Sequence, residues 1–326
     1  MKLRFVRSPS MRHHAIACLA TLALAAGSTA TLAQKYPERP IRIVNTFPAG
    51  GSGDQVIRTV FGKVSQSIGQ AYVVDTRAGA AGAIGTTHVA KSAPDGYTLV
   101  LGTASTFGTN SATQANLAYD PMADFTPVIQ MASTPYLLLA HPSVPAATVK
   151  ELVALAKARP GQMNYASSGT GTPPHLGVEL MKLTTGIAIT HIPHKGSAPA
   201  LTDLLAGHVA MAWVNPLTAL PQHRSGKARA LAVTTSRRSP AAPEIPTLME
   251  SGAATVDVGS WFAMLAPAGT NKDIATRLHN EITRAVSAPD ARARLDADGS
   301  EPFNMPPDET AAFIRSETAK WQKVVK

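Results

Sequence analysis

Two glycine-rich loops hold the residues best suited to chemistry. One is FPAGGSGD at 47–54 and the other is SSGTGTPP at 167–174, and each stands between a strand-like and a helix-like run. The first turn of a helix has unpaired backbone N–H groups and the positive end of the helix dipole, and glycines let a ligand approach that backbone. Each loop therefore predicts a site for an anion, either a carboxylate or a phosphate.

Ordinary helix capping would explain a single loop of this kind. Thr172 suits the N-cap and Pro173 the first helical position after the second loop, while Ser52 or Asp54 can cap the helix after the first. Two such loops favour binding, because ligands of α/β sheets bind at the carboxyl ends of the strands. If the loops faced each other, they would hold a molecule with an acidic group at each end.

Motifs for other chemistry are missing from the sequence. There is no G-x-x-x-x-G-K-[ST], and Gly79, Gly82 and Gly85 have the wrong spacing for a dinucleotide fingerprint. No G-x-S-x-G nucleophile motif occurs. His191 and His194 have a metal-like spacing, but strand-like residues and a proline surround them. We therefore expect no cofactor and no metal, and find no support for hydrolase chemistry.

Two further polar side chains are candidates for the same cleft. His175, at the start of the helix after the second loop, is either a polar cleft residue or a solvated or capping residue. Lys195, in the run HKGSAP, is a better anion partner than any histidine, but a solvated loop lysine is an equal alternative. The residue types alone leave both choices open.

The first 33 residues have the pattern of a secretory signal peptide. Basic residues without any acid precede the uncharged run AIACLATLALAAG, and small residues follow it. An uncleaved anchor or a buried helix is the alternative, but the run is too short to span a bilayer. We place cleavage after Ala33, with Ala30 as the second choice.

Removing this segment changes the charge of the chain. The sequence has 326 residues, 30 Lys and Arg against 21 Asp and Glu, a net charge of +9 and one cysteine. Cleavage removes four basic residues and Cys18, which leaves 26 against 21 and a net charge of +5. An exported chain without cysteine has no disulfide and no thiol nucleophile. A charge of +5 spread along the chain argues against binding to nucleic acid.

Strand-like and helix-like segments alternate along the rest of the chain. The first strands are expected at 41–44, 72–74 and 97–101, and a second series starts near residue 136. This order predicts an α/β fold with mostly parallel sheets and helices on both faces. Two helices, at about 271–287 and 307–324, close the chain and can return to cover the first sheet, which would create a hinge and a cleft.

Segments in order along the chain resemble one known family, the periplasmic substrate-binding proteins of tripartite tricarboxylate transporters, or Bug receptors. The segments that carry the resemblance are YPERPIRIV at 36–44, FPAGGSGD at 47–54, APDGY at 93–97, YDP and DFTPV within 119–128, NYASSGTGT at 164–172, KGSAPAL at 195–201, and WF and LAPAGT within 261–270. They span nearly all of the chain after residue 33, so the match is more specific than any single motif.

The resemblance implies a type II periplasmic binding protein fold, in which two α/β lobes close like a Venus flytrap. Residues 1–33 are then the signal peptide, residues 34–138 and 259–326 form lobe 1, and residues 139–258 form lobe 2. The chain would cross between the lobes at the two boundaries. The resemblance also implies a periplasmic location.

The ligands of this family are small organic acids, mostly di- and tricarboxylates with some aromatic and amino acids. Its two loops hold a carboxylate through backbone N–H groups, hydroxyls and bridging waters. Carried onto this chain, and joined by His175, the expected ligand-binding residues are Phe47, Gly51, Ser52, Asp54, Ser105, Ser167, Ser168, Gly169, Thr170, Thr172, His175, Lys195 and Pro199.

One departure from the family pattern bears on the ligand. The family often carries two Asp residues in the stretch that corresponds to 209–215, and this chain has Ala210 and Val214 there. Val214 removes a carboxylate that could meet an amino group in the cleft. This disfavours an amino-acid ligand and favours a di- or tricarboxylate or an aromatic carboxylate.

These features predict a monomeric binding protein rather than an enzyme. It would capture a small carboxylate between two lobes and deliver it to the membrane permease subunits of a tripartite tricarboxylate transporter. Two alternatives remain: a receptor that hands the same acid to a signalling system and, less favoured, an exported hydrolase.

Overall fold

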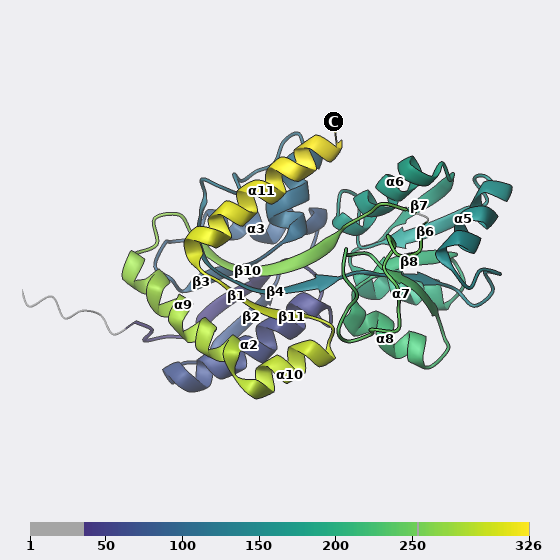
Figure 1. Ribbon diagram of the computed structural model, residues 1–326. Helices are drawn as coiled ribbons and strands as arrows, with labels where there is room; N and C mark the ends of the chain where they lie inside the picture. Colours follow the sequence, from purple (N-terminus) through teal and green to yellow (C-terminus); the bar gives the residue numbers. More distant parts are fainter. Residues whose placement is uncertain (1–35, 253, 326) are drawn as a thin grey trace, which may run out of the picture. The chain divides into compact units, whose positions relative to one another are not determined.

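The computed structural model describes residues 36–252 and 254–325. The signal peptide predicted at residues 1–33 lies outside them. The described residues from 39 onward belong to one compact unit. Two β-sheets with helices packed against them make up this unit (Figure 1).

The first sheet has six strands in the order β11-β4-β10-β3-β1-β2. Strand β1 is parallel to β2 and β3, whereas β10 is antiparallel to β3 and β4, and β11 is antiparallel to β4. The prediction of a mostly parallel sheet is therefore wrong, because the long strands β4 and β10 run side by side in opposite directions. The bounds are β1 (Ile41–Asn45), β2 (Tyr72–Thr76), β3 (Thr98–Thr103), β4 (Phe125–Pro135), β10 (Gly259–Pro267) and β11 (Glu301–Met305).

The second sheet has five strands in the order β7-β6-β8-β5-β9 and is also mixed. Strand β6 is parallel to β7 and β8, while β5 is antiparallel to β8 and β9. The bounds are β5 (Leu137–Ala140), β6 (Met163–Ser167), β7 (Ile189–Pro193), β8 (Met211–Val214) and β9 (Arg229–Val233).

The chain passes between the two sheets twice. Strand β4 ends at Pro135 and β5 begins at Leu137, so only Tyr136 separates the sheets at the first passage. On the return, Val258 donates its N–H to the carbonyl of Thr234 just before β10 begins. The division into lobes at residues 138 and 258 stays a prediction.

Helices from both ends of the chain cover the first sheet. Gln130 of β4 donates its N–H to Thr310 Oγ1 of α11 at 3.1 Å, and His279 Nδ1 of α9 lies 3.0 Å from the carbonyl of Val128. These contacts fix the C-terminal helices on β4 (Figure 1). The bounds are α2 (Ser52–Ile68), η1 (Ala80–Gly82), α3 (Ala83–Ala90), η2 (Ser105–Thr109), α4 (Asn110–Thr113), α9 (Lys272–Ser287), α10 (Pro289–Ala297) and α11 (Pro307–Val325).

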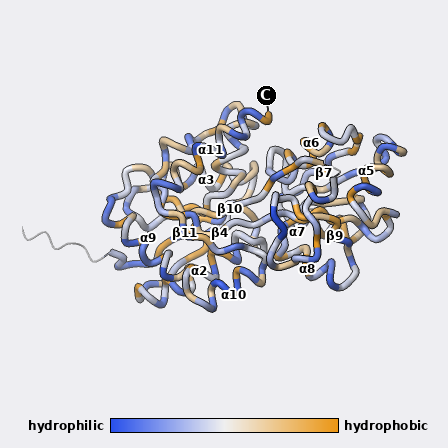
Figure 2. The backbone as a smooth tube through the Cα atoms, viewed as in Figure 1, coloured by the Kyte–Doolittle hydropathy of each residue, from blue (hydrophilic) through white to orange (hydrophobic). Residues whose placement is uncertain are grey.

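The second sheet is buried on both faces. Leu138 and Trp213 belong to one apolar cluster, while Leu137 and Val214 belong to another. Successive side chains of a strand point to opposite faces, so the two clusters lie on the two sides of the sheet. Apolar residues gather along the strands of both sheets (Figure 2). The helices beside this sheet are α5 (Val149–Ala158), α6 (Pro173–Thr185), α7 (Ser197–Leu205) and α8 (Pro216–Arg224).

Candidate ligand-binding site

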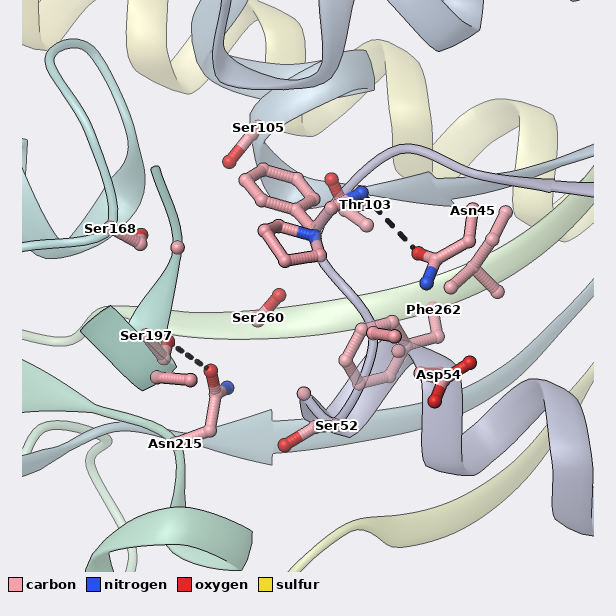
Figure 3. A pocket seen from close by; sticks show the side chains of 18 of the residues that line it. Asn45, Ser52, Asp54, Thr103, Ser105, Ser168, Ser197, Asn215, Ser260 and Phe262 are labelled. Atoms are coloured by element: carbon pink, nitrogen blue, oxygen red, sulfur yellow. Dashed lines mark hydrogen bonds between the residues drawn. The ribbon is translucent and has the colours of Figure 1, made fainter. Parts of the chain in front are cut away.

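A small cavity of about 60 Å³ is lined by residues from elements of both sheets (Figure 3). Its walls contain hydroxyl and amide side chains, three aromatic rings and the first turns of helices. The lining residues are Asn45, Phe47, Pro48, Ala49, Gly51, Ser52, Gly53, Asp54, Leu101, Thr103, Ser105, Tyr136, Ser168, Gly196, Ser197, Ala198, Asn215, Ser260 and Phe262.

The first wall is the glycine-rich loop between β1 and α2. Gln55 donates its N–H to the carbonyl of Gly51, and this is the first hydrogen bond of helix α2. The N–H groups of residues 52–54 therefore have no partner within the helix. Ser52 Oγ and the donor Asn45 Nδ2 are buried and have no hydrogen-bond partner among the described residues, and the same holds for one acceptor of this wall, Asp54 Oδ1. A buried donor without a partner is costly, so this wall is suited to a ligand that accepts hydrogen bonds.

The helix of the first loop is capped differently from the prediction. Gly51 is the N-cap of α2, and no side chain bonds to the cap, so the prediction of capping by Ser52 or Asp54 is wrong. Asp54 Oδ2 instead accepts hydrogen bonds from the N–H of Gly50 at 3.1 Å and from Arg58 Nε at 3.0 Å. Asp54 therefore reaches back to fix the loop that precedes the helix.

The opposite wall is the first turn of α7, at Gly196, Ser197 and Ala198. Ser197 Oγ donates to Asn215 Oδ1 at 2.8 Å, which leaves the amide nitrogen of Asn215 available to a ligand. Asn215 is also the N-cap of α8. A Cβ atom built on Gly196 would lie 3.1 Å from Pro48, so the two walls come into contact beside the cavity.

The second glycine-rich loop contributes less than expected. Ser168 lines the cavity, whereas Ser167, Gly169, Thr170 and Thr172 do not. The N-cap of α6 is Thr172 and Pro173 occupies its first position, as the sequence predicts. The hydroxyl of Thr172 bonds to the carbonyl of Gly169 at 2.7 Å rather than to the helix. The helix N-terminus that faces the first loop is that of α7.

The other expected site residues divide in the same way. Phe47 and Ser105 line the cavity, whereas His175, Lys195 and Pro199 do not. Lys195 is exposed. Lys, Arg and His are absent from the described lining, so an anion there would be held by neutral donors and helix N-termini. Whether the expected residues contact a ligand stays a prediction.

Val214 is fully buried in the apolar cluster with Leu137 and Val233 and does not line the cavity. The expectation that this side chain lies in the cleft is therefore wrong, because it packs in the core of the second sheet. Val214 therefore gives no reason to disfavour an amino-acid ligand, because a side chain buried in the core does not contact the ligand.

Sequence reasoning missed several lining residues, chiefly Asn45, Thr103, Tyr136, Asn215, Ser260 and Phe262. Asn45 ends a buried strand, and Asn215 stands directly before Pro216, a pattern typical of a helix start, so these two had a detectable signal. Tyr136 and Ser260 had none, because they meet only where the chain passes between the sheets. Burial raises the pKa of Tyr136 to about 12, so its hydroxyl remains a neutral donor at pH 7.

The described residues hold no group of three or more His, Cys, Asp or Glu side chains placed to bind a metal ion. His191 Nε2 lies 2.7 Å from Ser167 Oγ, while His194 Nε2 lies 2.7 Å from Asp203 Oδ2. The two histidines of the metal-like spacing thus have separate partners. No helix in the described parts of the chain is long and apolar enough to cross a membrane.

Comparison with protein families matches residues 56–326 to the tripartite tricarboxylate transporter family receptor. Among curated relatives, the protein BugT of Bordetella pertussis is 39% identical over 295 residues, which cover 90% of each chain.

Two solved structures share the fold over 89% of this chain. One is an R. palustris protein with adipate, which is 37% identical, is covered over 97% of its length and has a TM-score of 0.86. The other is MatC from Rhodopseudomonas palustris with bound malate, which is 32% identical, is covered over 100% of its length and has a TM-score of 0.84.

Proposed function

The chain belongs to the tripartite tricarboxylate transporter family of receptors, and from that premise we propose that it captures a small dicarboxylate in the cavity between its two sheets. One observation carries the proposal. The first turns of α2 and α7 line the same cavity from opposite sides, and buried donors without partners lie beside the first of them. Each helix N-terminus suits one carboxylate, so a ligand with two carboxylates satisfies both.

The relatives support this choice of ligand. Adipate and malate, the ligands of two similar structures, both carry a carboxylate at each end. No cation lines the described cavity, so binding depends on the number and geometry of neutral donors rather than on net charge. An aromatic carboxylate is the second candidate, because Phe47 and Phe262 provide ring faces beside the same donors.

Residues 34–138 with 259–326, and residues 139–258, act as two lobes that close on the ligand. The contact between Gly196 and Pro48 lies beside the cavity, where closure would bring the walls together. A ligand that contacts both walls binds the closed state more tightly and so shifts the population toward it. No chemical step is needed for this role.

The chain acts outside the cytoplasm as a monomer. Its signal peptide directs export to the periplasm, and the closed, loaded form delivers the acid to the permease subunits of a tripartite tricarboxylate transporter. A receptor that passes the signal to a sensor would use the same cavity, and only the identity of the membrane partner distinguishes it. Hydrolysis would need a nucleophile and a base beside the ligand, and the sequence has no nucleophile motif.

A thermal-shift screen of the protein without residues 1–33 tests the proposal. Succinate, malate, adipate, citrate, benzoate and glutamate are each added at millimolar concentration. A dicarboxylate is expected to raise the melting temperature most, because a ligand of the folded state stabilises it. No shift with any of these acids would contradict the proposal, and turnover of the acid would favour an enzyme.

A pair of variants locates the site. Ser197→Ala removes a hydroxyl from the cavity wall, and Ser225→Ala removes an exposed hydroxyl at the end of α8. The first is expected to reduce the ligand-induced shift and the second to leave it unchanged.

A further inference from the structure

A cluster of stacked rings lies behind the second glycine-rich loop, outside the cavity. It consists of Tyr165 on β6, His191 on β7 and His175 on α6. The ring centres of His175 and His191 are 4.2 Å apart, and those of His191 and Tyr165 are 4.8 Å apart. Nothing in the proposed capture of a ligand uses these two histidines directly.

His175 holds the loop through a bond that requires a neutral ring. Gly171 donates its backbone N–H to His175 Nδ1 at 3.2 Å, so this nitrogen must accept. A protonated imidazole has donors at both nitrogens and cannot accept this bond. His191 supports the other end of the loop, since its Nε2 lies 2.7 Å from Ser167 Oγ, which in turn accepts the N–H of Gly169 at 3.1 Å.

The loop links these histidines to both sides of the cavity. Ser168, between the two supported points, lines the cavity. A Cβ atom built on Gly171 would lie 2.8 Å from Thr113 Oγ1, so this part of the loop packs directly against α4. Helix α4 continues from η2, which carries the lining residue Ser105. Movement of Gly171 would therefore disturb the position of Ser168 and the contact with the first sheet's helices.

Charged groups on α6 and just after β7 lie near the ring cluster. Glu179 lies on the same helix as His175, where it forms an ion pair with Lys182 at 2.8 Å and accepts the Tyr165 hydroxyl at 2.7 Å. His194 follows β7 and faces Asp203 at 2.7 Å. Among these groups the carboxylate of Glu179 favours protonation of the two stacked histidines, while Lys182 opposes it.

Burial is the main effect on the two histidines. It lowers the pKa of His175, and it lowers the pKa of His191 to about 4, with a smaller contribution from the neighbouring His175. Both rings are therefore neutral at pH 7. Below the ordinary histidine range, protonation of His175 must remove the acceptor at its Nδ1 and place a positive charge on a ring whose centre lies 4.2 Å from that of His191.

We propose that His175 is a positioning residue for the binding site: its neutral ring keeps Gly171 and the second loop in place, and its protonation releases the loop and weakens ligand binding. This inference rests on the proposed function, because it assigns a consequence to the position of Ser168. Ligand affinity is then expected to fall as the pH drops below the ordinary histidine range and the ring of His175 becomes protonated, and the second loop is the part of the structure that changes.

Selective ¹⁵N-glycine labelling tests the step at the loop without any ligand. The amide shift and the exchange protection of Gly171 are followed by NMR from pH 7.5 to 4.5, together with the ring signals of His175. In the wild type, the Gly171 amide is expected to lose protection with the midpoint of the His175 ring. In His175→Asn, whose side-chain oxygen can accept the same bond without titrating, the protection should persist.

Affinity for adipate and for malate tests the consequence. Between pH 7.5 and the pH at which the ring signals show His175 to be protonated, the wild type is expected to lose about fivefold more affinity than His175→Asn. Protonation of the ligand affects both proteins equally. His175→Phe, which keeps a ring without an acceptor, should be about fivefold weaker than wild type already at pH 7.5. His88→Gln, on α3, is the matched control and should behave as the wild type.

Several outcomes would overturn the inference. A Gly171 amide that keeps its protection when His175 is protonated would refute the loop step, and an equal pH dependence in His175→Asn would refute the effect on binding. If His175→Phe fails to fold, the wild type and His175→Asn still decide. If neither the wild type nor any variant binds either acid at any pH, the proposed function is wrong. The titration of the Gly171 amide still shows whether protonation of His175 releases the loop, because it needs no ligand.

Discussion

The two glycine-rich loops are alike in sequence but differ in what they offer a ligand. In the first loop, Ser52 Oγ and the adjacent Asn45 Nδ2 are buried and have no partner among the described residues. In the second, the N–H of Gly169 donates to Ser167 Oγ and the N–H of Gly171 donates to His175. The second loop therefore satisfies much of its own hydrogen bonding.

This difference shows why a helix start after a glycine-rich loop is not by itself a binding site. The site is formed where the first turn of a helix lines the cavity, which holds for α2 and for α7, and unpaired buried donors lie beside the first turn of α2. The loop before α6 is bonded to itself and to two histidines, so it acts as a support from which Ser168 reaches the cavity. The following variants test the contrast between these regions.

The largest effect is expected from a charge placed in the α7 wall. Asn215→Asp keeps the shape of the side chain and sets an anion beside Ser197, where the second carboxylate of the ligand would lie. Like charges in an interface cost several kcal/mol, so affinity for a dicarboxylate should fall about 100-fold by calorimetry. Asn280→Asp, on the exposed face of α9, is the control. Equal affinity in both variants would show that α7 is not a wall of the site.

A second contrast concerns the helices that follow the two loops. In α6, a Cβ atom on Gly177 would lie 2.4 Å from the buried ring of Trp213, whereas a Cβ atom on Gly62 of α2 meets nothing within 4 Å. Gly177→Ala should therefore lower the free energy of unfolding by about 2 kcal/mol through overpacking. Gly62→Ala should raise it by up to about 1 kcal/mol through helix propensity. Urea denaturation measures both, and equal effects would contradict the packing difference.

The smallest effect separates the donors of the two loops. Ser52→Ala removes an unpaired buried hydroxyl from the first loop, and a hydrogen bond to a charged group contributes about 1.5–3 kcal/mol. Affinity for a dicarboxylate should fall at least about tenfold. Thr170→Ala changes an exposed residue of the second loop that does not line the cavity, so its affinity should stay within about twofold. A larger loss from Thr170→Ala would reverse the assignment of the loops.

Many helices and strands could be predicted from the sequence, because periodic burial is a local signal. The helices expected at about 271–287 and 307–324 are found at Lys272–Ser287 and Pro307–Val325, and β1 lies within one residue of its expected bounds. Strand β4 was missed because it is buried on most of its length and contains Gln130, Pro127 and Pro135, which break any alternation. Helix α8 was missed because Pro221 stands inside it and its apolar residues lack a helical period.

The sequence by itself determined that each of the two glycine-rich loops is followed by a helix, and so that backbone N–H groups suited to an anion occur at these two places. It also determined the family, since the matching segments run in order along the chain. Only the tertiary structure decided which donors remain unpaired. That depends on partners distant in the sequence, such as Asn215 for Ser197 and His191 for Ser167, and on the passages at Tyr136 and Ser260 that bring both walls to one cavity.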